Sequence, residues 1–130
     1  MSEPTTPFND FLGTRLVSRD GGRSEVALDL APHHTNKRGV AHGGVVSSVL
    51  DSALGAAVIS SMKPEEWCAT LQLSVTFIEG PRAGTITARG RVVRRGMRVA
   101  FAEGELVDEG GRTLATAQGV WYIWPARPAS

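Results

Sequence analysis

Apolar residues follow a helical period in one stretch of the chain. Between residues 43 and 62 they recur every three or four positions and cover most of a helical circumference, which predicts one long helix that Pro64 ends. The apolar positions are Val45, Val46, Val49, Leu50, Ala53, Leu54, Ala57 and Val58. Because so little of this circumference is polar, we expect the rest of the protein to surround the helix almost completely.

The remaining stretches follow the period of β-strands. Alternation of apolar and polar residues predicts strands over 71–77, 86–92, from 99 onward and over 113–124, separated by turns at 81–84, 94–96 and 109–111. Shorter strands are expected over 14–18 and 24–30, after a loose or short helical lead-in over 1–10, and a polar loop over 32–40. Hairpin links favour an antiparallel sheet. We therefore expect an α+β fold, a curved sheet wrapped around the helix in one domain over residues 1–130.

Composition adds few constraints. The chain has 130 residues, 42% hydrophobic and 21% charged, with a net charge of +1, which gives no reason to expect nucleic acid or a membrane surface as a partner. We expect no membrane-spanning helix, because polar residues interrupt every apolar run. The first ten residues lack the features of a signal peptide, and the single cysteine, Cys68, has no partner for an internal disulfide. A cytoplasmic protein is expected.

A glycine pair, Gly43 and Gly44, stands at the start of the expected helix. The first N–H groups of a helix have no intrahelical partner, and the helix dipole is positive there. Such groups suit the negative oxygen that develops when a thioester or ester carbonyl is attacked, so Gly43 is a candidate oxyanion donor. The alternative is a plain glycine-rich turn that lets the loop enter the helix.

Asp51 is the single acid of the expected helix. Ser47, Ser48 and Gly55 share its face, so the carboxylate lies in a trough of small residues with room for a ligand or a second polypeptide. A carboxylate in apolar surroundings is unfavourable unless it is paired or used, which makes Asp51 a candidate catalytic group. The alternative is a solvated residue, or one satisfied by the neighbouring serines.

The spacing of the two candidates constrains how they act. Gly43 and Asp51 are eight residues apart, or about 12 Å along a helix at ~1.5 Å per residue. They cannot act on the same carbonyl carbon from one chain. If both are catalytic, each site takes its donor from one subunit and its carboxylate from another, which predicts at least a dimer with two shared sites.

Asn36 and His42 flank this region and can each orient a carbonyl or a water molecule. The alternatives are a turn residue that satisfies its own loop for Asn36 and a capping or packing role for His42. His33, His34 and His42 match no familiar zinc spacing, and no cluster of Cys or acids completes them, so we expect neither a metal nor another cofactor. No serine lies in a nucleophile-elbow pattern.

Five arginines gather around the turn expected at 94–96. They are Arg89, Arg91, Arg94, Arg95 and Arg98. Spread over a hairpin, they could hold phosphates. The alternative is a solvated basic edge that protects the sheet from aggregation.

Two segments resemble a known family. HTNKRGVAHGGVVSSVLDSALGAA, followed by TLQLSVTFIEGPRAG, is similar to the PaaI-like branch of hotdog-fold acyl-CoA thioesterases, and the resemblance runs from the first strands to Tyr122. Asn36, the run from Gly39 to Gly44 and Asp51 stand at the family's spacing. The resemblance implies a long helix wrapped by a curved antiparallel sheet, and dimers that share two active sites and usually pair into tetramers.

The resemblance also implies roles. Asp51 is the nucleophile or the general base that activates water, and the N–H of Gly43 polarises the thioester carbonyl from the opposite subunit. Asn36 and His42 help to place the carbonyl or the leaving thiolate. Thr70 stands where this branch has a Ser or Thr that assists the water.

The family has no fixed motif for the phosphates of CoA, so Arg94, Arg95 and Arg98 are candidates for that contact. A neighbouring aryl-CoA branch has Glu at the acid position and Gln in place of Asn36, so the pairing of Asn36 with Asp51 favours the PaaI-like type. We expect metal-free hydrolysis of an acyl-CoA or aryl-CoA thioester. The alternatives are a thioesterase for carrier-protein-bound acyl groups, a non-catalytic acyl-CoA-binding module and a structural oligomer.

Overall fold

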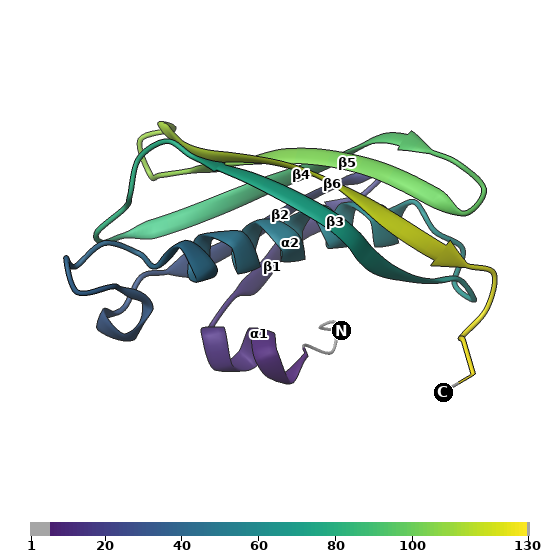
Figure 1. The fold of residues 1–130 in the computed structure, drawn as a ribbon, viewed down its shortest axis with the longest axis horizontal. Coiled ribbons are helices and arrows are strands. Elements are labelled where there is room, and N and C mark those ends of the chain that lie inside the picture. Colours follow the sequence, from purple (N-terminus) through teal and green to yellow (C-terminus); the bar gives the residue numbers. More distant parts are fainter. Residues whose placement is uncertain (1–5, 130) are drawn as a thin grey trace.

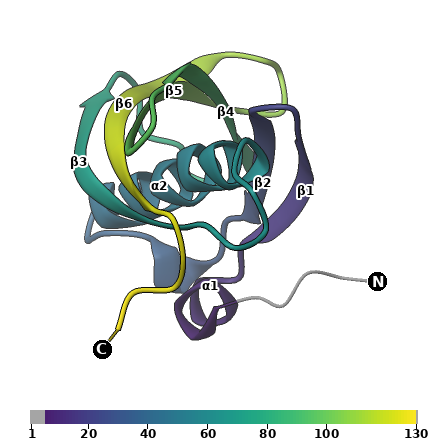
Figure 2. The same cartoon turned by 90° about the vertical axis from the view of Figure 1, so that its right-hand side faces the viewer.

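One curved antiparallel sheet surrounds a long helix in the computed structural model, which describes residues 6–129 (Figure 1). The six strands lie in the order β1-β2-β4-β5-β6-β3. Their bounds are Arg15–Asp20 (β1), Arg23–Asp29 (β2), Trp67–Phe77 (β3), Thr85–Arg95 (β4), Val99–Val107 (β5) and Thr113–Trp124 (β6). The helices are α1 (Pro7–Leu12), the 3-10 turn η1 (Pro32–His34) and α2 (Gly43–Ser60). The expected wrapping of a sheet around one helix is confirmed (Figure 2).

Helix α2 is the centre of the core. Val49, Leu50, Ala53 and Leu54 have no exposed surface, as expected from the helical period. By length and composition α2 could cross a membrane, contrary to the sequence-based expectation, but here its apolar side chains pack inside the sheet. Its apolar character is explained by this enclosure, as for the core helix of a globular domain.

The sheet approaches the backbone of α2 closely at Ala53. A Cβ atom on Gly90 of β4 would lie 2.8 Å from the carbonyl oxygen of Ala53, so only glycine fits there. The buried hydroxyl of Ser24 donates a hydrogen bond to the same carbonyl. These contacts hold the middle of α2 against β2 and β4, and they set the depth at which the helix lies in the sheet.

A β-bulge divides β3 into two parts. Thr70 pairs with Trp121 of β6 and Gln72 with Val120, so Leu71 has no partner in the register. Side chains alternate between faces of a strand, so this extra residue reverses the alternation. Both Thr70, before the bulge, and Leu73, after it, can therefore face α2.

Several boundaries differ from the expectations. Helix α2 ends at Ser60, two residues early, where the hydroxyls of Ser60 and Ser61 bond to the carbonyls of the preceding turn. Strand β3 begins at Trp67, and β4 continues through Arg94 and Arg95, which were expected in a turn. A bulge between Val92 and Arg94 allows this continuation. The first five residues of the expected lead-in lie outside the described residues.

Candidate active site

A trough of about 1110 Å³ runs along the side of α2 that the sheet leaves open. Figure 2 shows the two edge strands of the sheet, β1 and β3, on opposite sides of α2. Its floor includes the face of α2 that carries Ser47, Asp51 and Gly55, and β3 contributes Cys68 and Thr70. The trough of small residues expected from the sequence is therefore present, with the carboxylate within it.

The carboxylate of Asp51 is held by one neighbour. The Thr70 hydroxyl donates a 2.9 Å hydrogen bond to Oδ1 of Asp51. Ser48, which was considered as a partner, donates instead to the carbonyl of Gly44 at 2.7 Å. Within residues 6–129, Oδ2 has no hydrogen-bond partner and no cation pairs with the carboxylate. One oxygen of Asp51 is thus positioned and the other is available to a ligand.

The start of α2 offers one free backbone donor. His42 is the N-cap residue, and its Nδ1 accepts a 2.8 Å hydrogen bond from the N–H of Gly44. The N–H of Gly43 has no partner among the described residues. The capping role considered for His42 is confirmed, and it leaves the N–H of Gly43 free beside the Phe77 ring, which lies 3.4 Å from the Cβ position of Gly43.

Asn36 organises the loop before α2. Its Oδ1 accepts hydrogen bonds from the N–H groups of Arg38 (2.9 Å) and Val40 (3.3 Å). The chain reverses at Gly39, which has a φ of +76°. The alternative role of Asn36 as a turn residue is therefore present, and the side chain shapes the loop that leads into the helix.

Cys68 adds a thiol to the trough. It is half-buried, and burial raises the pKa of its thiol; the negative charge of Asp51 raises this pKa further. Both causes disfavour the thiolate, which is the nucleophilic form of cysteine. This microenvironment does not favour Cys68 as the group that attacks a carbonyl.

Three of the five clustered arginines are engaged in ion pairs. Arg89 bonds to Glu25 at 3.0 Å and Arg91 to Glu103. Arg95 binds both oxygens of Glu66 at 2.7 and 2.9 Å, and the side chain of Glu66 is only 9% exposed. The hydrogen bond from the N–H of Lys63, and after it that from Arg95, lower the pKa of Glu66. Arg95 is one of the three arginines predicted to contact CoA. Its ion pair with Glu66 instead joins the end of β4 to the segment before β3.

Arg94 and Arg98 are the other two arginines predicted to contact CoA. They lie at the β4–β5 turn, and this turn is near the C-terminal end of α2 (Figure 1). Neither has an ion-pair partner among the described residues. Their contact with CoA stays a prediction.

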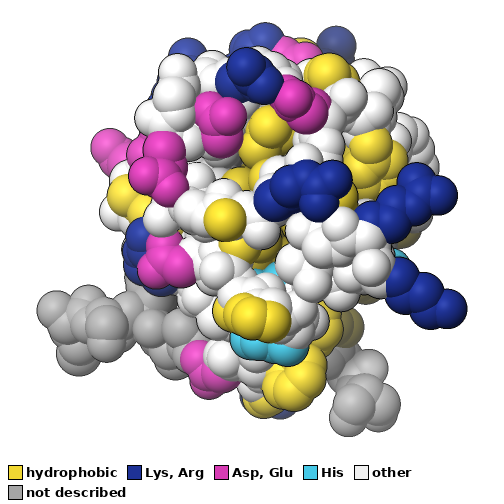
Figure 3. All heavy atoms as spheres, turned by 90° about the vertical axis from the view of Figure 1, so that its left-hand side faces the viewer, with side chains coloured by type: hydrophobic (Ala, Val, Ile, Leu, Met, Phe, Trp, Pro, Cys, Tyr) yellow, Lys and Arg dark blue, Asp and Glu magenta, His cyan; other side chains and the backbone are white. Residues whose placement is uncertain are grey.

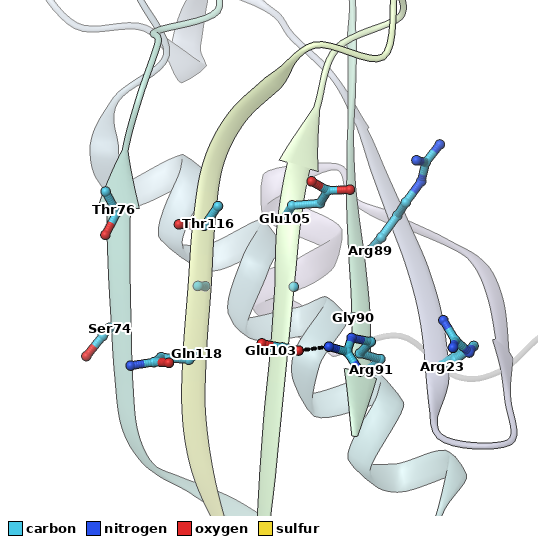
Figure 4. A pocket seen from close by; sticks show the side chains of 12 residues that line it. Arg23, Ser74, Thr76, Arg89, Gly90, Arg91, Glu103, Glu105, Thr116 and Gln118 are labelled. Carbon is cyan, nitrogen blue, oxygen red and sulfur yellow. Dashed lines mark hydrogen bonds and ion pairs between the residues drawn. The ribbon is translucent and has the colours of Figure 1, made fainter. Parts of the chain in front are cut away.

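A second hollow, of about 600 Å³, lies on the outer face of the sheet (Figure 4). Two rows of polar side chains cross the strands there, one through Arg89 and Glu105 and the other through Arg91 and Glu103. In each row an Arg of β4 stands opposite a Glu of β5. This matched pattern supports the alternative of a solvated, charged sheet face for Arg89 and Arg91, rather than a phosphate site.

The described residues contain no group of three or more His, Cys, Asp or Glu side chains arranged to hold a metal ion. The trough offers a carboxylate and a hydroxyl, and the start of α2, outside the residues that line the trough, offers a free backbone donor. The model of one family, the thioesterase superfamily, matches residues 38–115, which include Asp51, Gly43 and Thr70. This chain belongs to the thioesterase superfamily.

Similar proteins agree with this membership. A protein of Saccharolobus solfataricus named for a proposed esterase activity is 32% identical over 113 residues, which cover 87% of this chain and 80% of the relative. The medium/long-chain acyl-CoA thioesterase YigI of Salmonella typhimurium is 26% identical and covers 90% of this chain and 85% of its own length. A mutant of the phenylacetic acid degradation protein PaaI from Thermus thermophilus superposes with a TM-score of 0.82, at 26% identity over 90% of this chain and 98% of PaaI. The resemblance to PaaI-like hotdog thioesterases is confirmed.

Sequence reasoning missed a residue that supports the loop before this candidate site. His34 is 3% exposed; its Nδ1 accepts from the N–H of Ala31, and its Nε2 donates to the carbonyl of Leu12 at 2.7 Å. Its own carbonyl accepts from the N–H of His42 at 2.8 Å. His34 therefore ties α1 to the residue that caps α2, and no local pattern signalled this link between distant segments.

Proposed function

We propose that this thioesterase hydrolyses an acyl-CoA or aryl-CoA thioester to a free acid and CoA. The observation that carries the proposal is the pair of unused groups on α2, Oδ2 of Asp51 and the N–H of Gly43. The acyl-CoA activity named for YigI and the link of PaaI to phenylacetic acid degradation support a CoA thioester as the substrate. We place the protein in the cytoplasm, where CoA thioesters are made and used.

The chemistry needs a base and an oxyanion donor. In the favoured route Oδ2 of Asp51 accepts a proton from a water molecule while the water oxygen bonds to the thioester carbon. The carbonyl oxygen becomes negative and accepts a hydrogen bond from the N–H of Gly43. The carbonyl then reforms as the C–S bond breaks, the departing sulfur of CoA takes the proton from Asp51, and the acid and CoA are released. Direct attack by the carboxylate, followed by hydrolysis of the anhydride, is the second route.

Thr70 supports either route by holding the carboxylate. Its hydroxyl proton points to Oδ1 of Asp51, so Thr70 can accept a hydrogen bond from the attacking water but has no second proton to donate. Asn36 and His42 act by shaping the loop and cap that present the N–H of Gly43. The exposed Nε2 side of His42 remains available to the substrate carbonyl or the leaving thiolate.

A second copy of the chain completes the site. Gly43 and Asp51 lie on the same helix, about 12 Å apart at ~1.5 Å per residue, so they cannot reach one carbonyl together. The edge strand β3 exposes Leu71 (61%) and Phe77 (57%), and an apolar edge strand readily pairs with another chain. We infer a dimer through this edge that brings Gly43 of one subunit to Asp51 of the other, and pairing of dimers into a tetramer.

Asp51→Asn tests the proposal, because it removes the base and keeps the shape. Loss of a positioned acid–base group lowers the rate by at least ~10²-fold. We expect that loss in release of free thiol from a panel of CoA esters, with the melting temperature and oligomeric state unchanged. Near-wild-type hydrolysis by this variant would refute the assignment. Tight binding of CoA esters by the wild type without thiol release would instead identify a non-catalytic module.

A further inference from the structure

Two loops meet beside the N-terminal end of α2. The loop over 36–40 packs against the connection between β3 and β4, where the N–H of Ala41 donates to the carbonyl of Pro81 at 2.8 Å. The guanidinium of Arg82 crosses from one loop to the other and donates to the carbonyl of Arg38 at 2.8 Å. Residues far apart in the sequence are thus held together next to Gly43.

The contact gathers three positive charges, those of Lys37, Arg38 and Arg82, which we call the basic cluster. All three side chains are exposed, and none has an ion-pair partner among the described residues. In Figure 3, Lys and Arg side chains project from the middle and the right of this end of the molecule, whereas Asp and Glu side chains are more frequent at the left and at the top, where further Lys and Arg side chains lie among them.

The nearby carboxylates are already engaged elsewhere. Glu79 binds Arg112 through both oxygens, at 2.8 and 2.9 Å. Asp29 accepts from Thr85 and Arg15, and these hydrogen bonds lower its pKa. The charge of the basic cluster is therefore left for an anion from outside the chain.

The basic cluster lies at the end of α2 that carries the free N–H of Gly43. Arg38 precedes Gly43 by five residues, and the dipole of α2 adds positive potential at this end. The β4–β5 turn with Arg94 and Arg98 lies toward the opposite end of this 18-residue helix, which is about 25 Å long at ~1.5 Å per residue. An anionic group joined to the reacting thioester by a flexible arm can approach the basic cluster from the Gly43 side.

We propose that the basic cluster binds the phosphate groups of the CoA moiety, its diphosphate and its 3′-phosphate. The inference rests on the proposed function, because it assigns the polar end of the same substrate. Arginine presents a planar fork of donors that matches phosphate oxygens, and lysine adds a point charge. Arg38 and Arg82, which come from two loops, can bind one phosphate together, and Lys37 can bind another. The exposed position suits a nucleotide that stays partly in water.

The test compares two thioesters of the same acyl group, one on CoA and one on N-acetylcysteamine, which keeps the end of the pantetheine arm and lacks every phosphate. Hydrogen bonds to charged groups are strong enough that the variant Lys37→Gln/Arg38→Gln should raise KM for the acyl-CoA by about 10- to 10²-fold. Its kcat, and its kcat/KM for the N-acetylcysteamine thioester, should stay within about twofold of wild type. Arg23→Gln/Lys63→Gln, which removes two exposed cations elsewhere, is the matched control and should leave KM and kcat unchanged for both thioesters.

Salt and direct binding add independent readouts. The wild-type KM for acyl-CoA should rise with ionic strength, and that of the double variant should rise less, because screening acts on the lost charges. Adenosine 3′,5′-bisphosphate, titrated calorimetrically, should bind the wild type and not the double variant. This binding experiment stands even if no thioester is hydrolysed, so failure of the proposed function is distinguishable from failure of the inference.

Three outcomes overturn the inference. Equal losses on both thioesters would mean that the basic cluster only shapes the loop before Gly43. A rise in KM for acyl-CoA with Arg94→Gln/Arg98→Gln, and none with Lys37→Gln/Arg38→Gln, would place the phosphates at the β4–β5 turn. A defect confined to acyl groups on a carrier protein would identify an acidic protein as the partner instead.

Discussion

The hydroxyl of Thr70 lies 2.9 Å from Oδ1 of Asp51, in the trough where β3 lies beside α2. The two residues are nineteen positions apart and come from different elements. Their contact depends on the bulge at Leu71, which allows Thr70 to face the helix while the rest of β3 keeps Leu73 and Val75 against the core. The bulge in β3 therefore allows Thr70 to hold the carboxylate of Asp51.

Replacing Thr70 tests what this hydrogen bond contributes. Thr70→Val keeps the size and removes the hydroxyl, so Asp51 loses its one positioned oxygen. A hydrogen bond to a charged group is worth ~1.5–3 kcal/mol, so kcat should fall by about 10- to 10²-fold if the bond is needed in the transition state. Thr70→Ser keeps the hydroxyl and should stay within about threefold of wild type. Steady-state kinetics on one CoA ester compares the two variants. Equal activity of Thr70→Val and Thr70→Ser would contradict a role for the hydroxyl of Thr70.

The free N–H of Gly43 can be deleted without disturbing the helix. Proline is favoured at the first helical position, and His42, with φ −60° and ψ 140°, has the extended backbone that a following proline requires. Gly43→Pro should therefore fold and lose ~10²–10³-fold in kcat, the usual effect of removing an oxyanion donor. Gly43→Ala retains the N–H and is the matched control, with its methyl group against the Phe77 ring. Comparable kcat values for the two variants would exclude this N–H as the donor.

Mixing two inactive variants tests whether sites are shared between subunits. In a dimer of Gly43→Pro with Asp51→Asn, one of the two sites combines an intact Gly43 with an intact Asp51. Random exchange makes half of the dimers mixed, so about a quarter of wild-type activity should return. Exchange of either variant with the double variant Gly43→Pro/Asp51→Asn should restore nothing. Absence of rescue after exchange has been verified by mass spectrometry would argue for sites within one chain.

The thiol of Cys68 reports on the charge of Asp51. Burial raises the pKa of this thiol and the carboxylate raises it further, so removing the negative charge lowers the pKa and increases the thiolate fraction at a given pH. Asp51→Asn should therefore speed alkylation by iodoacetamide near pH 8, by less than about tenfold because burial is the larger cause. Mass spectrometry follows the modification, with the unfolded chain as the reference for intrinsic reactivity. Unchanged rates would show that the carboxylate does not act on the thiol.

Much of the fold follows from local pattern. The expected strand over 113–124 coincides with β6, and the helical period placed the start of α2 at Gly43, because each depends on alternation or spacing within one segment. The end of α2 was placed two residues late, because the serines that close its last turn compete with the helix through their side chains. The continuation of β4 through Arg95 was missed, since a turn pattern does not reveal the partly buried ion pair with Glu66.

Local sequence pattern is sufficient to locate the components of the candidate site. Helical spacing puts Asp51 in a row of small residues and leaves it about 12 Å from Gly43, and the glycine pair marks the start of the helix. Which polar groups are paired and which are free depends on the folded arrangement of the chain. Thr70 reaches Asp51 through a bulge, His42 caps Gly44 and leaves the N–H of Gly43 without a partner, and Arg82 joins Lys37 and Arg38 across two loops. Each of these outcomes depends on pairing in space, and local periodicity carries no information about the partner that a polar group finds after the chain has folded.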